Sequence, residues 1–92
     1  MKLIEAIRDC EMLDEEAIIF AVEPWTEDSA AAVEREPETG GIPENAQRLG
    51  MKYFLEIFIV RGFFDDWAAN PNTEPSLSEK CKQIIHYAIY DA

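Results

Sequence analysis

The sequence has one histidine, His86, and two cysteines, Cys10 and Cys81, among its 92 residues. Two cysteines are too few for the disulfide framework of a small secreted domain. Two thiols and one imidazole at unrelated spacings do not supply the ligand set of a metal site. No glycine pattern of the kind that binds phosphate occurs either, since "GG" at 40–41 is followed by Ile42 and Pro43. We therefore expect no metal and no cofactor.

Long apolar runs are also absent. No stretch of about 18 apolar residues occurs that could span a membrane. The first twelve residues contain Glu5, Arg8, Asp9 and Glu11, which interrupt any signal-peptide core. The sequence therefore predicts a soluble, cytoplasmic protein.

Basic residues are scarce, and the imbalance lies in one half of the chain. The formal net charge is −11, and residues 1–44 hold 13 acidic residues against Lys2, Arg8 and Arg35. Such a surface repels nucleic-acid phosphates and anionic lipid headgroups, so we expect neither DNA, RNA nor membrane as a partner. A basic protein partner is favoured by charge complementarity. Acidity that serves only solubility is the alternative.

Patterns of catalytic residues are missing as well. No serine lies in a nucleophile-elbow motif, and neither cysteine has a histidine at a motif distance. The adjacent acidic pairs, such as Asp65 with Asp66, point in different directions and do not converge as glycosidase carboxylates must. We therefore expect a protein that is not an enzyme.

The residues that are present predict one small α+β domain over residues 1–92. Apolar residues make up 48% of the chain, enough for a core. Periodicity predicts a helix, two strands and a loop with one helical turn, then a third strand and two helices. These segments cover residues 2–13, 17–25, 30–36, 37–50, 51–59, 60–69 and 76–90. The order αβββαα indicates a three-stranded antiparallel sheet with helices packed mainly on one face.

The third predicted strand, residues 51–59, carries apolar residues on both sides. Alternation places Tyr53 and Leu55 on one face and Phe54 and Phe58 on the other. Exposed aromatic area of this kind marks an interface. A homodimeric or regulatory domain, with a second copy or a small ligand on this face, is therefore an alternative function.

Trp25 lies at the end of the first predicted strand, directly after Pro24, and among Glu23, Glu27 and Asp28. A tryptophan surrounded by carboxylates is typical of an anchor for a cationic partner, because it offers a cation–π face. The alternative is that the ring folds back and covers the end of the sheet.

His86 lies on the side of the last predicted helix that faces away from the apolar stripe, one turn before Tyr90. No carboxylate near it in the helix could hold its tautomer, as a catalytic histidine requires. His86 is therefore either solvated surface or, with Tyr90, a small recognition patch.

Three segments of the chain, "LGMKYFLEIFIV", "DDWAAN" and "PSLSEKCKQIIHYAIYDA", resemble a family of small acidic bacterial domains without an assigned function. The shared positions are Trp25, Gly50, Tyr53, Leu55, Ile57, Tyr87, Asp91 and Ala92. The resemblance implies a fold and no activity. Compact acidic domains of this size are also similar to immunity proteins that neutralise toxins.

The leading hypothesis is a non-enzymatic interaction domain that presents an acidic face to a basic protein, for example a toxin in an immunity pairing. The residues assigned to partner binding are Glu23, Trp25, Glu27, Asp28, Glu34, Glu36, His86 and Tyr90.

Overall fold

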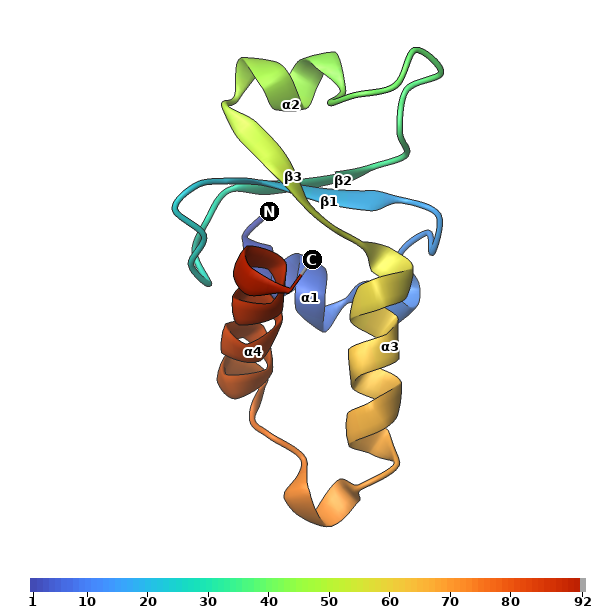
Figure 1. The fold of residues 1–92 in the computed structure, drawn as a ribbon, viewed down its shortest axis with the longest axis vertical. Helices are drawn as coiled ribbons and strands as arrows, with labels where there is room; N and C mark the ends of the chain where they lie inside the picture. Colours follow the sequence, from blue (N-terminus) through green and yellow to red (C-terminus); the bar gives the residue numbers. More distant parts are fainter. Residues whose placement is uncertain (92) are drawn as a thin grey trace.

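The computed structural model describes residues 1–91 and shows an α+β fold with a three-stranded antiparallel sheet, which confirms the predicted class (Figure 1). Ala92, one of the positions of the family resemblance, lies outside the described residues. The helices are α1 (Leu3–Arg8), α2 (Glu44–Arg48), α3 (Ile57–Ala68) and α4 (Leu77–Tyr90), with 3-10 turns η1 (Cys10–Met12) and η2 (Pro71–Thr73). The strands are β1 (Ile18–Val22), β2 (Ala31–Glu34) and β3 (Met51–Glu56).

Strand β1 lies between β2 and β3 and pairs antiparallel with both. Ile19 and Ala21 face the main core, whereas Ile18 and Phe20 belong to a second apolar cluster on the opposite face of the sheet. Because both faces of β1 are covered, its sequence is a continuous apolar run without alternation.

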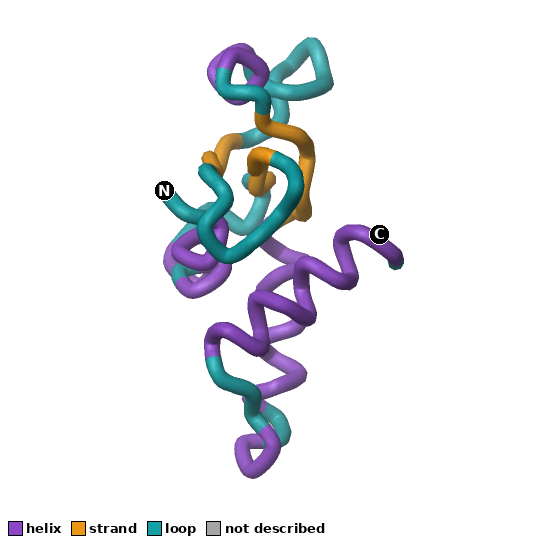
Figure 2. The backbone as a smooth tube through the Cα atoms, turned by 90° about the vertical axis from the view of Figure 1, so that its left-hand side faces the viewer, coloured by secondary structure: helices purple, strands orange, loops and turns teal. Residues whose placement is uncertain are grey.

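The main core lies between the sheet and the helices α1, α3 and α4, all on one face, as the sequence predicts (Figures 1 and 2). Leu3 and Ile7 of α1, Val60 of α3 and Ile84 of α4 are fully buried there. The helix predicted over residues 2–13 is shorter than expected, because α1 ends after Arg8 and the chain continues as η1.

The second apolar cluster is smaller and is covered by residues 37–50. Ile42 and Ala46 of this segment pack over Ile18, Phe20 and Met51. The helical turn predicted within the segment is α2. Burial of these two side chains is worth about 2–3 kcal/mol in total, far less than the contribution of the main core.

The boundary between β3 and α3 corrects the sequence prediction. The strand ends at Glu56 and the helix begins at Ile57, whereas the sequence predicts a strand to residue 59. An irregularity in the β1–β3 register lies between Ile19 and Phe20, whose partners are Leu55 and Tyr53. Phe54 is the extra residue of this bulge, and it joins Leu55 in the main core.

The predicted exposed face with Phe54 and Phe58 is therefore wrong. Phe54 is 1% exposed, and Phe58, which is 54% exposed, lies on α3 instead of β3. Simple alternation could not anticipate the bulge. The homodimer or ligand-binding alternative stays a prediction, and of its two aromatic residues Phe58 is exposed and Phe54 is buried.

Helices α3 and α4 form an antiparallel arm that extends away from the sheet (Figure 2). Phe63 and Tyr87 meet edge to face at 5.1 Å between ring centroids. The Lys80 ammonium lies 4.8 Å from the centroid of the Phe64 ring. Ser76 caps α4, since its hydroxyl oxygen accepts from the main-chain N–H of Glu79 at 3.2 Å. No helix within residues 1–91 is long and apolar enough to cross a lipid bilayer.

Candidate interaction surface

The residues that the sequence assigns to partner binding lie in three separate places. The groups are Glu23, Trp25, Glu27 and Asp28 between β1 and β2; Glu34 and Glu36 at the far end of β2; and His86 and Tyr90 on α4. The length of β2, about 13 Å for its four residues, separates the first two groups (Figure 1). The structure therefore does not gather these residues into one continuous surface.

Trp25 covers the end of the sheet, which is the second of the two sequence alternatives. Its ring is partly buried against the main core and meets Phe54 edge to face at 4.9 Å between ring centroids. The indole Nε1–H donates to the carbonyl oxygen of Ala21 at 3.2 Å. Because the ring packs against Phe54 and its N–H is satisfied by Ala21, Trp25 is held within the fold and is not a free anchor for a cation.

Two acids of the same connection also make internal contacts. The Ser78 hydroxyl in the first turn of α4 donates to the Glu27 carboxylate. The Lys2 ammonium lies 3.2 Å from the Asp28 carboxylate. Glu27 and Asp28 thus connect the β1–β2 loop to α4 and to the N-terminus. Within residues 1–91, Glu23 is the exposed acid of this group that has no ion pair or side-chain hydrogen bond.

His86 and Tyr90 lie on the exposed side of α4, where the sequence places them. Their ring centroids are 4.6 Å apart, and Tyr90 is 70% exposed. Among residues 1–91 no carboxylate contacts His86. The pair forms a small aromatic surface, far along the chain from the acidic segments.

Two carboxylates flank the open end of the second apolar cluster. Glu34 of β2 and Glu56 of β3 are both the direct register partners of Ile18 on the central strand. Directly opposed residues of antiparallel strands share a face, so both carboxylates lie on the same face as Ile18. Two strand spacings, about 10 Å, separate them.

Tyr53 lies on the same face, next to Glu56 along the edge strand β3. It is the register partner of Phe20, packs edge to face on that ring at 6.3 Å, and remains 42% exposed. Its hydroxyl donates to the Glu56 carboxylate. Burial, this hydrogen bond and the negative charges of Glu56 and Glu36 together raise the pKa of Tyr53 well above its usual value of 10.0.

We call Glu34, Glu36, Tyr53 and Glu56 the sheet-face patch. None of its three carboxylates has an ion-pair partner within residues 1–91. An exposed aromatic ring next to uncompensated carboxylates is a favourable site for a cationic side chain.

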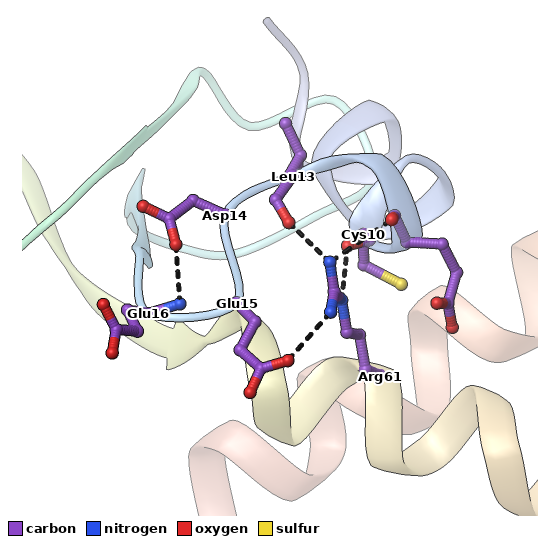
Figure 3. Close-up of polar contacts among 7 residues, drawn as sticks. Cys10, Leu13, Asp14, Glu15, Glu16 and Arg61 are labelled. Carbon is purple, nitrogen blue, oxygen red and sulfur yellow. Dashed lines mark hydrogen bonds and ion pairs between the residues drawn. The ribbon is translucent and has the colours of Figure 1, made fainter.

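The basic residues of the chain are largely occupied by internal contacts, and Arg61 is the clearest example (Figure 3). Its guanidinium donates to the carbonyl oxygens of Cys10 at 2.9 Å, Leu13 at 2.6 Å and Glu11 at 3.2 Å. It also donates to the Glu15 carboxylate at 3.0 Å. Arg61 thereby attaches α3 to the end of η1.

Five further basic side chains are also paired with acids. They are Lys2, Arg8, Arg35, Arg48 and Lys80. Within the described part of the chain, Lys52 and Lys82 are the basic side chains left without an acidic partner. The ion pairs of residues 1–91 engage seven of the 19 acids, so twelve carboxylates there remain uncompensated, and the negative surplus lies on the surface.

Sequence reasoning missed Tyr53 and Arg61. The available signal for Tyr53 was its position near the start of a predicted strand, with Glu56 three residues later. No local signal identifies Arg61, because its partners lie 46 to 51 residues earlier in the chain.

The remaining chemistry of the described residues is limited. Residues 1–91 contain no group of three or more His, Cys, Asp or Glu side chains placed to hold a metal ion, and no pocket. Burial raises the pKa of both the Cys10 and the Cys81 thiols to about 11. Both sulfur atoms are therefore protonated and shielded at neutral pH.

Comparison of the chain with protein-family models, with curated proteins and with solved structures found no match. The resemblance to a family of small acidic domains therefore stays a prediction.

Proposed function

We propose that this protein is a non-enzymatic interaction domain that binds a basic protein through the sheet-face patch. The observation that carries the proposal is an acidic, partly aromatic sheet face: the charges of Glu56 and Glu36 act on the half-exposed Tyr53, and Glu34 lies across Ile18 on the same face, all three carboxylates without an ion-pair partner within residues 1–91. A lysine or arginine side chain placed over this ring would meet both a cation–π face and charge-assisted hydrogen bonds.

The charge distribution supports the same proposal. Because six of the eight lysine and arginine side chains are paired internally, few cations remain on the surface to repel a basic partner. A negative surface of this kind steers a basic partner and raises the association rate. The partner class includes toxins of the kind that immunity proteins neutralise. We place the interaction in the cytoplasm, where the free thiols of Cys10 and Cys81 would stay reduced.

The proposed surface changes the residue assignment made from the sequence. Glu34 and Glu36 keep their role, and Tyr53 takes the place of Trp25 as the aromatic centre. Glu27 and Asp28 have internal partners and make at most a long-range contribution. His86 and Tyr90 are not needed for the interaction.

The test is affinity capture from the native host at about 0.05 M and about 1 M salt, conditions between which the screening length falls about four- to fivefold. Three forms of the protein are compared. They are the wild type, a triple variant E34Q/E36Q/E56Q, and a matched triple variant E11Q/E23Q/D65N that removes the same number of charges elsewhere on the exposed surface.

We expect the wild type and the matched variant to capture the same basic protein at low salt, and the sheet-face variant to lose it. High salt should release the partner from every form. A partner that is acidic, that persists at high salt, or that binds the sheet-face variant as well as the wild type would contradict the proposal.

A further inference from the structure

Residues 37–50 are held against the sheet without a polar contact. All their hydrogen bonds and ion pairs within residues 1–91 are internal to the segment. The Gly40 N–H donates to Pro37, Gln47 donates to Pro43 and Ile42, and Arg48 pairs with Glu44. Apart from its covalent ends, the segment is therefore attached to the rest of the molecule through apolar contacts.

These apolar contacts are few. Ala46 of α2 is fully buried, Pro43 is buried and Ile42 is partly buried, and Ala46 and Ile42 lie over the second apolar cluster. Gly41 and Gly50, with φ of 80° and 72°, stand on either side of α2. Because glycine adopts many backbone conformations at little cost, these positions allow the segment to swing without strain elsewhere.

The face beneath the segment is apolar, and its open end is acidic. Phe20 and Met51, which Ala46 helps to cover, are almost completely buried. Glu34 and Glu56 of the sheet-face patch adjoin this surface through their shared partner Ile18. Since α2 itself shows that a helix fits here, the chemistry favours a helix with one apolar face and basic residues at its margin.

We propose that residues 37–50 form a flap, and that a basic amphipathic helix of the partner displaces α2 from the second apolar cluster. The inference rests on the proposed function and adds the structural form of the partner and the way in which the surface opens. Opening exposes Phe20, Ile18 and Met51 while the main core on the opposite face of the sheet stays intact.

The test is thiol labelling of an Ala46→Cys variant with an uncharged reagent, with each labelled site identified by mass spectrometry. Cys10 and Cys81 are fully buried in the main core and report global unfolding in the same molecule. Ala6→Cys is the matched control, because Ala6 is also fully buried but belongs to the main core.

We expect the thiol introduced at position 46 to react about 100-fold faster than the native thiols or the thiol introduced at position 6, because local opening costs less than global unfolding. A low concentration of urea should not change the labelling rate at position 46. Equal labelling rates at position 46 and in the main core would overturn the flap. Hydrogen exchange on the unmodified chain gives an independent measurement. The amides of Leu49 and Gly50, which bond within the segment, should exchange faster than those of β1.

The helix part of the proposal is tested with two synthetic peptides of identical composition. One carries leucine on one helical face and lysine on the other, and the second is a permutation without an apolar face. We expect the first peptide to raise labelling at position 46 about 10-fold and leave Cys10 and Cys81 unchanged, since a displaced flap stays open. No increase, or an equal increase with both peptides, would overturn displacement. Either result leaves the salt-dependent capture experiment unaffected, so the two proposals fail separately.

Discussion

The Arg61 Nη2 atom donates to the carbonyl oxygen of Leu13 at 2.6 Å, across 48 residues of sequence. Through this bond and three others the guanidinium joins the second turn of α3 to the segment that leaves η1. Carbonyl groups at the end of a helical turn lack partners within the turn, and a buried unsatisfied carbonyl is costly. Arg61 supplies donors to the carbonyl oxygens of Glu11 and Leu13, and adds a second donor to that of Cys10, which also accepts from the Leu13 N–H.

Replacement of Arg61 by Met should therefore lower the free energy of unfolding by about 2–4 kcal/mol, as expected when several carbonyl groups lose their donors together. Arg61→Lys should recover only part of this, because an ammonium cannot reproduce the planar fork of donors. Urea unfolding followed by circular dichroism measures the free energy of unfolding of both variants. Arg48→Met, which removes an exposed pair with Glu44, is the control and should cost less than about 0.5 kcal/mol. Equal losses at the two positions would contradict the role of Arg61.

The packing of Trp25 on Phe54 predicts a stability effect. Trp25→Ala should lower the free energy of unfolding by about 2–4 kcal/mol, below the range for a fully buried aromatic because the ring is half-buried. Trp25→Phe should cost less, since it keeps an aromatic ring against Phe54 and loses the bond to Ala21. Chemical denaturation monitored by circular dichroism checks the prediction. A change within about 0.5 kcal/mol for Trp25→Ala would indicate an exposed ring and restore the anchor interpretation.

Substitution of two glycines by alanine should change the stability of the protein in opposite directions. Gly62 lies inside α3, and a Cβ atom built there meets nothing within 4 Å. Gly62→Ala should raise stability by about 0.5–1 kcal/mol, because alanine loses less backbone entropy in a helix. Gly50 has a φ of 72°, in the left-handed region. Gly50→Ala should therefore lower the free energy of unfolding by about 1–2 kcal/mol, the cost of this region for a residue with a Cβ atom. Thermal unfolding of the two single variants, compared with the wild type, tests both signs.

The Tyr53 hydroxyl should lose its proton at a higher pH than an ordinary tyrosine when the absorbance is followed through an alkaline titration. Its pKa is raised by burial first, then by the bond to Glu56 and the charges of Glu56 and Glu36. The folded state therefore holds this proton more tightly than the unfolded state. The resulting stability is complete below pH 10 and is lost as the pH rises toward the folded pKa.

Glu56→Gln should bring the Tyr53 titration to lower pH, and Glu36→Gln should do so to a smaller extent, because Glu56 contributes both the bond and the larger charge effect. Asp65→Asn, on the outer side of α3, is the control and should leave the titration unchanged. A titration that is insensitive to Glu56 would show that the sheet-face patch is not arranged as described.

The local features of this protein could be predicted from its sequence because they depend on neighbouring residues. The Ser76 cap, the exposed position of His86 and the apolar strand Ile18–Val22 all follow from periodicity and side-chain chemistry over a few residues. The α+β class follows from the order of those segments. Acidity, too, is a property of composition alone.

The positions that decide the candidate site depend on strand register and on contacts between distant segments. A single bulge opposite Ile19 and Phe20 moves Phe54 into the core, and the register of three strands brings Glu34 and Glu56 to either side of Ile18. Trp25 packs inward because Phe54 lies in the core beside it. Arg61 donates its hydrogen bonds within the protein because η1 ends beside α3. The sequence by itself determined that the protein is acidic. Only the tertiary structure decided which of the carboxylates have no cationic partner, because pairing between remote strands leaves no local signal in the sequence.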